Sequence, residues 1–191
     1  MSVTIIGLSG LAAKHMTTAA LTDENAIYNS FEKTESLWLY SDKIGGAAAT
    51  NVERAKVAIA GPLGLSSKEA VYFIAVEDNQ GRPLLSSCDY RVTGSSIDAR
   101  WWSLTLYDSE TQHYVPNAIN RSSWNSAAIP KGTNGDWVIN VSQTSKQETW
   151  LPSQERGARP FELNLRVYNP SAETRAKIPN ITLPNVVRAS C

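Results

Sequence analysis

The feature that most constrains the fold of this chain is residues 100–107, Arg-Trp-Trp-Ser-Leu-Thr-Leu-Tyr, which alternate along a predicted β-strand. Successive side chains of a strand point to opposite faces of a sheet, so this stretch has two different faces. The apolar face carries Trp102, Leu104 and Leu106, and the polar-aromatic face carries Trp101, Ser103, Thr105 and Tyr107. The apolar face belongs to a hydrophobic core. The other face is typical of a ligand-binding sheet, and also of a half-buried sheet packed under a loop.

Further strands are predicted by apolar runs and by alternation, at residues 70–76, 89–92, 136–143, 161–168 and 186–187. Clusters of turn-forming residues separate them, and Asn134-Gly135 is a dipeptide that favours a tight hairpin turn. Several short strands at this spacing, with almost no helical pattern after residue 70, are typical of all-β proteins. We therefore expect a mainly β fold, an antiparallel jelly-roll-like β-sandwich.

One or two helices are predicted before these strands. Acidic residues in a first turn predict a helix over roughly residues 22–35. The capping box Thr50-x-x-Glu53 predicts a second helix, which ends at Gly61-Pro62. These helices are expected to pack against one edge or face of the sandwich.

The chain is expected to have two parts, residues 1–49 and residues 50–191. The first is an N-terminal extension, partly helical, and the second is the β-sandwich domain. The apolar run Val3–Ala13 has about half of the roughly 20 residues that span a bilayer. It is either the remnant of a membrane anchor or export signal, or a short buried element of the fold.

The charge balance narrows the classes of partner. The chain has 18 Lys and Arg residues against 18 Asp and Glu residues, so its formal net charge at pH 7 is zero. Such a chain lacks the positive field by which proteins attract nucleic acids and anionic membrane surfaces. We therefore expect no nucleic-acid partner.

The chain has two cysteines, Cys88 and Cys191. A zinc site takes four ligands, and His15 and His113 do not complete one at a recognisable spacing, so we expect no metal and no cofactor. A disulfide between the two cysteines is the sharper prediction. It would close a loop of about 100 residues and stabilise the fold by roughly 4–5 kcal/mol in the chain-entropy model. The alternative is two unrelated free thiols, and the disulfide presumes an oxidising compartment.

Six motifs follow one another along the chain in the order found in one bacterial family. They are Gly81-Arg82-Pro83, Cys88-x-Tyr90-Arg91-Val92-x-Gly94, Ala99-Arg100-Trp101-Trp102-Ser103-Leu104-Thr105-Leu106-Tyr107, Val115-Pro116-Asn117-x-x-Asn120-Arg121, Trp150-Leu151-Pro152 and Phe161-Glu162-Leu163-Asn164-Leu165-Arg166-Val167-Tyr168-Asn169-Pro170. Over roughly residues 50–191 the chain resembles the family called domain of unknown function 1214.

The resemblance implies a jelly-roll β-sandwich and no established activity. Short members of that family usually begin with a hydrophobic membrane anchor that places the domain in the periplasm. The resemblance therefore implies a periplasmic or cell-envelope location for this chain, with membrane association through the N-terminus in a longer form.

The residues with the best ligand-binding chemistry lie on the predicted strands and in the loop after residue 107. Arginine and asparagine offer fixed hydrogen-bonding groups for sugar hydroxyls or a carboxylate, and Trp or Tyr rings offer a stacking face. The predicted ligand-binding residues are Arg100, Trp101, Tyr107, Asn117, Asn120, Arg121, Trp150 and Arg166. The structural alternative is that the arginines and asparagines satisfy backbone carbonyls and that Trp150-Leu151-Pro152 packs a corner.

Two sets of residues could carry catalysis, and the spacing supports neither strongly. Ser103, Asp108 and His113 have the chemistry of a catalytic triad, but they lie close together in sequence and no Gly-x-Ser-x-Gly elbow frames the serine. Asp108 and Glu110 could be the acid and base of glycoside hydrolysis, yet neighbouring acids after a strand are ordinarily turn formers. No catalytic residue is assigned.

The favoured function is a non-catalytic cell-envelope module that binds a carbohydrate or another envelope component. It predicts a shallow groove on the polar-aromatic face of the sheet, lined by Trp101, Tyr107 and Arg166, without a titratable group of shifted pKa. Fold analogy adds little, because sandwiches host many functions.

Two alternatives come from other classes of protein. A hydrolase acting on a glycan or amide would bury Asp108, Glu110 or Glu162 close to an arginine. A structural or protein-interaction module would dock a partner through an exposed apolar patch, such as Leu37–Tyr40.

Overall fold

The computed structural model describes residues 31–41, 46, 49–51, 54, 65–66, 68–146, 149–154 and 157–191. Contacts within the chain divide it into two units, Met1–Phe31 with Asp42–Ser67 and Glu32–Ser41 with Lys68–Cys191. Most of the described residues belong to the second unit, and the fold that follows is the fold of that unit.

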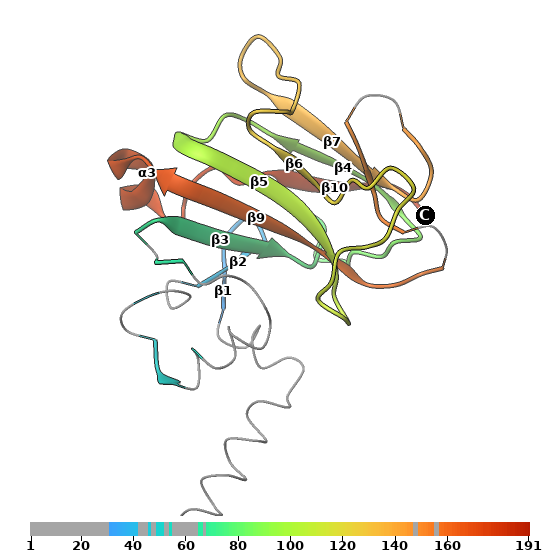
Figure 1. Cartoon of the computed structure of the whole chain (residues 1–191), viewed down its shortest axis with the longest axis horizontal. Coiled ribbons are helices and arrows are strands. Elements are labelled where there is room, and N and C mark those ends of the chain that lie inside the picture. The colour runs from blue at the N-terminus through green and yellow to red at the C-terminus, as the bar shows by residue number, and fades with distance from the viewer. Residues whose placement is uncertain are drawn as a thin grey trace, which may run out of the picture. The chain divides into compact units, whose positions relative to one another are not determined.

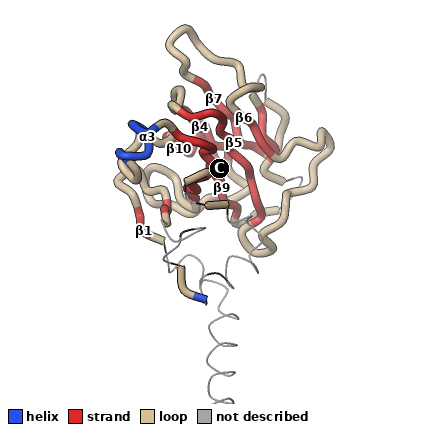
Figure 2. The backbone as a smooth tube through the Cα atoms, turned by 60° about the vertical axis from the view of Figure 1, so that its left-hand side comes forward, coloured by secondary structure: helices blue, strands red, loops and turns tan. Residues whose placement is uncertain are grey.

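The second unit is built from two β-sheets (Figure 1). The six-stranded sheet has the order β1-β2-β3-β9-β5-β6, with β1 (Glu32–Lys33), β2 (Leu39–Tyr40), β3 (Ala70–Ala75), β9 (Phe161–Pro170), β5 (Ala99–Asp108) and β6 (Ser123–Asn125). The four-stranded sheet has the order β10-β4-β7-β8, with β10 (Asn185–Ser190), β4 (Asp89–Gly94), β7 (Trp137–Ser142) and β8 (Trp150–Pro152). A short helix, α3 (Ala172–Lys177), follows β9, and the rest of the described unit is strand and loop (Figure 2).

The prediction of a mainly β fold is confirmed, and six predicted strands are present as β3, β4, β5, β7, β9 and β10. The sequence did not predict β6 and β8, because three residues are too few to show an alternating pattern. It also missed α3. This helix follows Pro170 and begins at the N-cap Ser171, whose hydroxyl accepts a hydrogen bond from the Thr174 N–H. Glu173 in its first turn and Lys177 in its last turn suit the helix dipole.

The hydrophobic core lies between the two sheets and includes the predicted apolar face of β5. Trp102, Leu104 and Leu106 are each almost fully buried, and the Trp102 ring lies 4.8 Å from the ring of Trp137 on the opposite sheet. The strands β3, β4, β5, β7 and β9 contribute Val71, Phe73, Tyr90, Val92, Trp102, Leu104, Leu106, Trp137, Ile139, Val141, Leu163, Leu165 and Val167 to this core. Burial of one such side chain stabilises the fold by roughly 1.5–3 kcal/mol.

Two details of the predicted sandwich are wrong. β7 and β8 pair in parallel, with Asn140 opposite Trp150 and Ser142 opposite Pro152, so the four-stranded sheet is mixed rather than antiparallel. The indole N–H of Trp150 supports this pairing by donating to the Ser142 carbonyl (2.9 Å). Asn134-Gly135 does not close a hairpin, because the strands on either side of it, β6 and β7, lie in different sheets. The jelly-roll connectivity stays a prediction.

The first predicted N-terminal helix is wrong at its C-terminal end. Glu32–Lys33 form β1, because they pair with β2 and because Lys33 forms an ion pair with Glu77. The remainder of that helix up to residue 30, and the apolar run Val3–Ala13, lie outside the described residues. Within the described ranges, every helix is too short or too polar to cross a membrane.

The second predicted N-terminal helix is described at two positions. Asn51 and Arg54 are helical, and the Arg54 N–H donates to the Thr50 carbonyl (3.0 Å). Glu53 of the predicted capping box and residues 55–64 lie outside the described residues. The extent of this helix therefore stays a prediction.

The segment Leu37–Tyr40 belongs to the core and is not an exposed docking patch. Trp38 is buried, and its indole N–H donates to the Pro184 carbonyl (2.8 Å). Tyr40 stacks on Phe73, with 5.4 Å between the ring centroids. The expectation of an exposed apolar surface here is wrong, because the rings of this segment pack inward.

A disulfide joins Cys88 and Cys191, as predicted, so the free-thiol alternative is excluded. Cys88 directly precedes β4 and Cys191 directly follows β10, and these two strands are hydrogen-bonded neighbours. The bond closes a loop with a sequence separation of 103 residues. It therefore fastens the last residue of the chain to the start of a central strand.

Two buried or half-buried carboxylates reinforce the same strand, β10. Asp78 forms ion pairs with Arg82 (2.8 Å) and with Arg188 of β10 (3.2 Å). Asp89 accepts hydrogen bonds from the Lys146 ammonium group (2.7 Å) and, at the end of β10, from the Ser190 hydroxyl (3.3 Å). Burial by itself would raise the pKa of each carboxyl. The pKa of Asp78 is nevertheless lowered by its hydrogen bonds from Arg82 and from the Gln80 N–H, and that of Asp89 by its bonds from Lys146, Ser142 and Ser190.

We expect Cys191→Ser to lower the free energy of unfolding by about 2–5 kcal/mol, because an open chain gains entropy when a loop of this length is released. Urea denaturation without reductant measures the change. The matched control is Ser190→Ala, which leaves the disulfide in place and should change the free energy by less than about 0.5 kcal/mol. Reductant should lower the free energy of unfolding of the unsubstituted protein to that of Cys191→Ser. Equal midpoints without reductant would contradict the prediction.

Candidate functional site

The outer face of the six-stranded sheet, the face turned away from the four-stranded sheet, carries the densest group of polar and aromatic side chains described here. The antiparallel pairing of β5 with β9 places these residues opposite one another (Figure 1). The pairs are Trp101 with Tyr168, Ser103 with Arg166, Thr105 with Asn164, and Tyr107 with Glu162. This outer-face cluster contains Trp101, Tyr107 and Arg166, three of the residues that the sequence predicted to bind a ligand.

At one end of the outer-face cluster, Tyr107 lies between Arg166 and Tyr114. The Arg166 guanidinium donates through Nη2 to the Tyr107 hydroxyl (2.7 Å) and lies 5.4 Å from the centroid of the Tyr107 ring. The ring of Tyr114 stacks on the ring of Tyr107, with 5.0 Å between the centroids. Tyr114 is 56% exposed, so it presents an aromatic surface to solvent beside a fixed cation.

The pKa of Tyr107 is raised to about 12. Burial is the largest cause, the neighbouring Tyr114 hydroxyl adds to it, and the positive charge of Arg166 offsets only part of the increase. The prediction that this face has no titratable group of shifted pKa is therefore wrong. Tyr107 is a neutral phenol at physiological pH, as tyrosine ordinarily is, and the shift extends this to more alkaline pH. The phenol therefore supplies a hydrogen bond and not a negative charge.

At the other end of the cluster, Trp101 and Tyr168 form a tilted aromatic pair with 5.2 Å between their centroids. Both rings are half-buried. Trp101 and Tyr107 are six residues apart on β5, which corresponds to about 20 Å along a strand. The face therefore has an aromatic group at each end.

The floor between the two aromatic ends is polar and closely packed. Ser103, Thr105, Glu162 and Asn164 are all buried, and Glu162 is only 2% exposed. The Asn164 amide donates to Glu162 across 3.4 Å on the same face of β9. The sequence predicted the polar character of these positions on β5, but alternation alone did not show how deeply they are buried.

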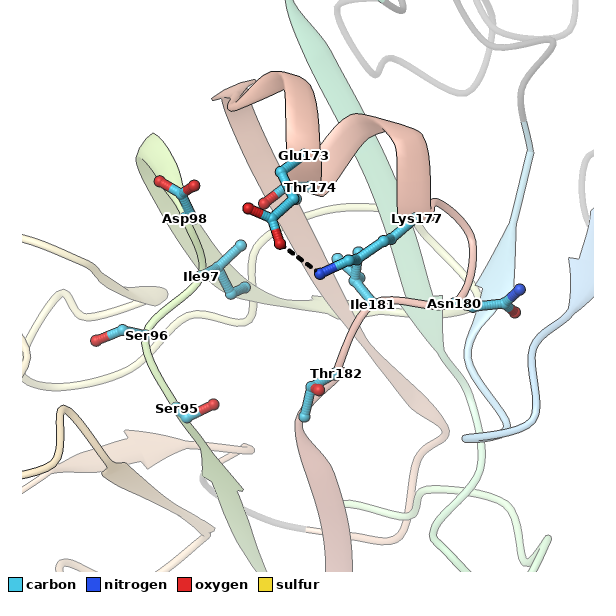
Figure 3. A pocket seen from close by; sticks show the side chains of 10 residues that line it. All are labelled: Ser95, Ser96, Ile97, Asp98, Glu173, Thr174, Lys177, Asn180, Ile181 and Thr182. Carbon is cyan, nitrogen blue, oxygen red and sulfur yellow. Dashed lines mark hydrogen bonds and ion pairs between the residues drawn. The ribbon is translucent and has the colours of Figure 1, made fainter.

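A separate surface pocket of about 310 Å³ lies beside α3 (Figure 3). The connection between β4 and β5 forms one wall, and α3 with the segment after it forms the other. Its lining residues are Ser95, Ser96, Ile97, Asp98, Glu173, Thr174, Lys177, Asn180, Ile181 and Thr182. The ion pair between Glu173 and Lys177 (2.6 Å) satisfies two of its charges internally. No sequence pattern predicts this pocket, because its walls come from segments about 75 residues apart.

The family of the chain is decided by a match to a family model. Residues 69–172, more than half of the chain, match the model described as "Protein of unknown function (DUF1214)". The chain belongs to this family. The matched range begins just before β3 and ends at the first residue of α3, so it covers both β5 and β9 of the outer-face cluster.

Two solved structures are similar to this chain. The VPA0106 protein from Vibrio parahaemolyticus matches with a TM-score of 0.60 and 22% sequence identity over 74% of this chain and 36% of that protein, which shows a shared fold. An uncharacterized protein from Burkholderia cenocepacia matches with a TM-score of 0.41 and 14% identity over 63% of this chain and 29% of that protein. The chain thus spans about a third of the length of these proteins. A search of curated proteins finds no match.

The motif Val115-Pro116-Asn117-x-x-Asn120-Arg121, one of those that resemble the DUF1214 family, has a structural role. In the connection from β5 to β6, the Asn117 amide donates to the carbonyls of Val115 (3.0 Å) and Arg121 (2.9 Å) and accepts from the Arg121 N–H (2.9 Å). Asn120 is exposed and has a φ of 51°, a left-handed conformation that asparagine tolerates. The structural alternative therefore accounts for Asn117, whereas the side chain of Asn120 faces solvent.

Three further predicted ligand residues lie apart from the outer-face cluster. Arg121 packs over the ring of the buried Trp124, 4.0 Å from the ring centroid. Trp150 lies on β8 of the other sheet, and its carbonyl accepts a hydrogen bond from the Trp124 indole (3.1 Å). Arg100 is exposed and alternates with Trp101 along β5, so it does not share the face of Trp101.

The structure does not assemble a catalytic triad from Ser103, Asp108 and His113. Ser103 is buried on the outer face of β5, and Asp108 lies at the end of that strand with the opposite alternation. The backbone carbonyl of the exposed His113 accepts the Asp108 N–H (3.0 Å), and this bond closes the turn. The described residues also contain no group of three or more His, Cys, Asp or Glu side chains that could hold a metal ion.

Asp108 and Glu110 hold a turn rather than forming an acid–base pair. Asp108 accepts hydrogen bonds from the Thr111 N–H (2.9 Å) and from Arg159 Nε (2.9 Å), and Glu110 accepts from Arg159 Nη2 (2.6 Å). Burial alone would raise the pKa of Asp108, but the bonds from Thr111 and Arg159 outweigh it and lower the pKa. A carboxyl of lowered pKa is a poor general acid at neutral pH.

We expect Asp108→Asn to lower the free energy of unfolding by about 1 kcal/mol at neutral pH, because the charge-assisted bonds to Arg159 and Thr111 weaken. Since the folded pKa lies below the unfolded value of about 3.9, the stabilisation is complete above that value and is lost as the pH falls through the folded pKa. Denaturation at several pH values should show the free energies of unfolding of the unsubstituted protein and of Asp108→Asn converging as the pH falls. Glu110→Gln is the matched control and should have a smaller effect, since Glu110 is exposed. A difference that persists unchanged in acid would contradict the prediction.

Proposed function

We propose that this domain is a non-catalytic module that binds a carbohydrate through the outer face of its six-stranded sheet. Sugar rings carry apolar C–H faces, which pack on aromatic rings, and hydroxyl groups, which need hydrogen-bonding partners. The outer-face cluster supplies both kinds of group. Tyr114 and the Trp101–Tyr168 pair supply rings, while Tyr107 and Arg166 supply polar groups.

The observation that carries the proposal is the arrangement of Tyr114, Tyr107 and Arg166. The Tyr114 ring is exposed, and its stacking on Tyr107 sets its orientation. Arg166 is half-buried and is aimed by its bond to the Tyr107 hydroxyl. An ordered ring beside an ordered cation loses little conformational entropy when a ligand binds, which favours recognition.

A location in an oxidising compartment is part of the proposal. The support is the Cys88–Cys191 disulfide, because such bonds form and persist in the bacterial periplasm, at cell surfaces and in secreted proteins. A cell-envelope location would also bring the domain to glycans.

A hydrolase acting on a glycan or amide remains the second candidate because of one residue. Glu162 is 2% exposed and lies on the outer face, directly opposite Tyr107 on the neighbouring strand. A carboxyl group in a site that excludes water can serve as a general acid in hydrolysis. Catalysis would need Glu162 to reach a substrate. The proposal of a binding module needs only the exposed Tyr114 ring and the fixed Arg166 cation.

The binding proposal predicts that Tyr114→Ala weakens glycan binding at least about tenfold, as loss of a central aromatic contact commonly does. A glycan array identifies the ligand, and isothermal titration calorimetry then measures the dissociation constant. Ile119→Ala is the matched control, because Ile119 is 49% exposed in the same connection and lies outside the cluster. Equal weakening by both substitutions would contradict a site centred on Tyr114.

The two candidate functions differ in their products. If the domain only binds, labelled oligosaccharides incubated with it stay intact, and Glu162→Gln changes neither the products nor their rate of appearance. If it is a hydrolase, shorter fragments accumulate and Glu162→Gln abolishes them. Mass spectrometry of the incubated sugars decides between the two, and cleavage that depends on Glu162 would overturn the non-catalytic proposal.

A further inference from the structure

We infer that the glycan bound at the outer face carries a carboxylate and that Arg166 binds this carboxylate. The inference rests on the proposed carbohydrate-binding function and names the chemical class of the ligand. The expected ligand is therefore a glycan that contains uronic acid. Three features of Arg166 lead to this conclusion: its missing counter-charge, its free donors and its position beside Tyr114.

The first feature is the absence of an acidic partner. In the part of the chain that the structure describes, Arg82, Arg159 and Arg188 each form an ion pair with a carboxylate. Arg166 forms none with any described residue, and neither do the exposed Arg100 and the half-buried Arg121, but of these three Arg166 alone belongs to the outer-face cluster. Arg166 contacts Tyr107 through the Tyr107 hydroxyl and ring, and the other groups that act on its charge, Tyr114 and Tyr168, are phenols rather than carboxylates. Buried or half-buried charges are ordinarily paired with an opposite charge. Arg166 is thus a cation whose counter-ion is not supplied by its described neighbours.

The neighbouring residues do not supply a negative charge to Arg166. Tyr107 stays a neutral phenol, since its pKa is about 12. The acid on the same face of the same strand is Glu162, four residues away, which corresponds to about 13 Å along β9. Among the described residues no ion pair joins Glu162 to Arg166, whose guanidinium bonds the Tyr107 hydroxyl instead.

The second feature is the number of unused donors on Arg166. A guanidinium has five N–H donors in a planar fork, and one N–H bonds the Tyr107 hydroxyl. The remaining edge of the fork matches the two oxygens of a carboxylate, which it can bind through two parallel hydrogen bonds. Tyr107 holds the guanidinium in place before a ligand arrives, because it contacts Arg166 with both its hydroxyl and its ring.

The third feature is the exposed ring of Tyr114 beside this cation. Tyr114 stacks on Tyr107, and Tyr107 contacts Arg166, so one side chain joins the ring surface to the cation. A uronic acid has an apolar ring face and a carboxylate on the same sugar. Its ring face would pack on Tyr114 while its carboxylate binds Arg166.

The experiment compares acidic sugars with their own methyl esters. The probes are short oligomers of galacturonic, glucuronic and mannuronic acid, each paired with its methyl ester, which keeps the sugar and removes the charge. Isothermal titration calorimetry should show the preferred acid binding about 10- to 100-fold more tightly than its ester. Raising the salt concentration should weaken binding of the acid and leave that of the ester nearly unchanged.

Two substitutions test the role of Arg166 itself. Arg166→Gln should remove the preference for acid over ester, and Arg166→Lys should keep only part of it, because lysine retains the charge without the fork. Tyr107→Phe removes the acceptor that positions Arg166 and should weaken binding of the acid more than that of the ester. Circular dichroism and the unfolding midpoint verify the fold of each variant. If Arg166→Gln does not fold, Arg166→Lys and Tyr107→Phe decide, and an acid-over-ester preference that both leave unchanged overturns the inference.

The outcomes separate this inference from the proposed function. If acids and esters bind equally, or neutral glycans bind and acids do not, the carboxylate inference is overturned while carbohydrate binding stands. If a broad array of neutral and acidic glycans shows no binding, the proposed function fails and the inference fails with it. A preference for acids that Arg166→Gln leaves unchanged would place the carboxylate elsewhere and would also overturn the inference.

Discussion

The pairing of β5 with β9 is the interaction on which the rest of the structure depends. Nine registered pairs run from Ala99 opposite Pro170 to Asp108 opposite Phe161. Because both strands alternate, this one register places a hydrophobic face toward the four-stranded sheet and a polar-aromatic face away from it. A slip of one residue would exchange the two faces and bury polar groups in the core. The same pairing therefore determines the core and assembles the candidate site.

Some charged groups of this domain stabilise the fold through ion pairs, and others form no ion pair. Asp78, Asp89 and Asp108 have lowered pKa values because each accepts bonds from a cation and from other donors, and each holds a turn or strand end in place. Arg166 differs, because its described partner is the neutral Tyr107. An arginine that forms no ion pair with a carboxylate of the same protein is the better candidate for contact with a ligand. Membership of the DUF1214 family agrees with the fold and leaves this assignment to the chemistry of the site.

Much of the candidate site could be predicted from the sequence, since period-two alternation places Trp101, Tyr107 and Arg166 on strand faces without knowledge of the partner strands. The prediction that residues of the loop after β5 bind a ligand has less support. Asn117 and Arg121 have suitable side chains for ligands, but their hydrogen bonds and ring contacts fold the loop itself. Tyr114 was not predicted, because it lies in an irregular segment and becomes significant only through its stacking on Tyr107.

The sequence by itself determined the strands that alternate over six or more residues and the apolar face of β5, because these follow from local periodicity. It offered the Cys88–Cys191 disulfide as a prediction beside two free thiols, and the structure decided between them. Only the tertiary structure decided the division of the strands between two sheets, the parallel pairing of β7 with β8, and the short strands β6 and β8. These features depend on contacts between distant segments, and a strand of three residues is too short to carry a periodic signal. The tertiary structure also decided which arginines pair with a carboxylate, because a counter-charge is a property of neighbours in space.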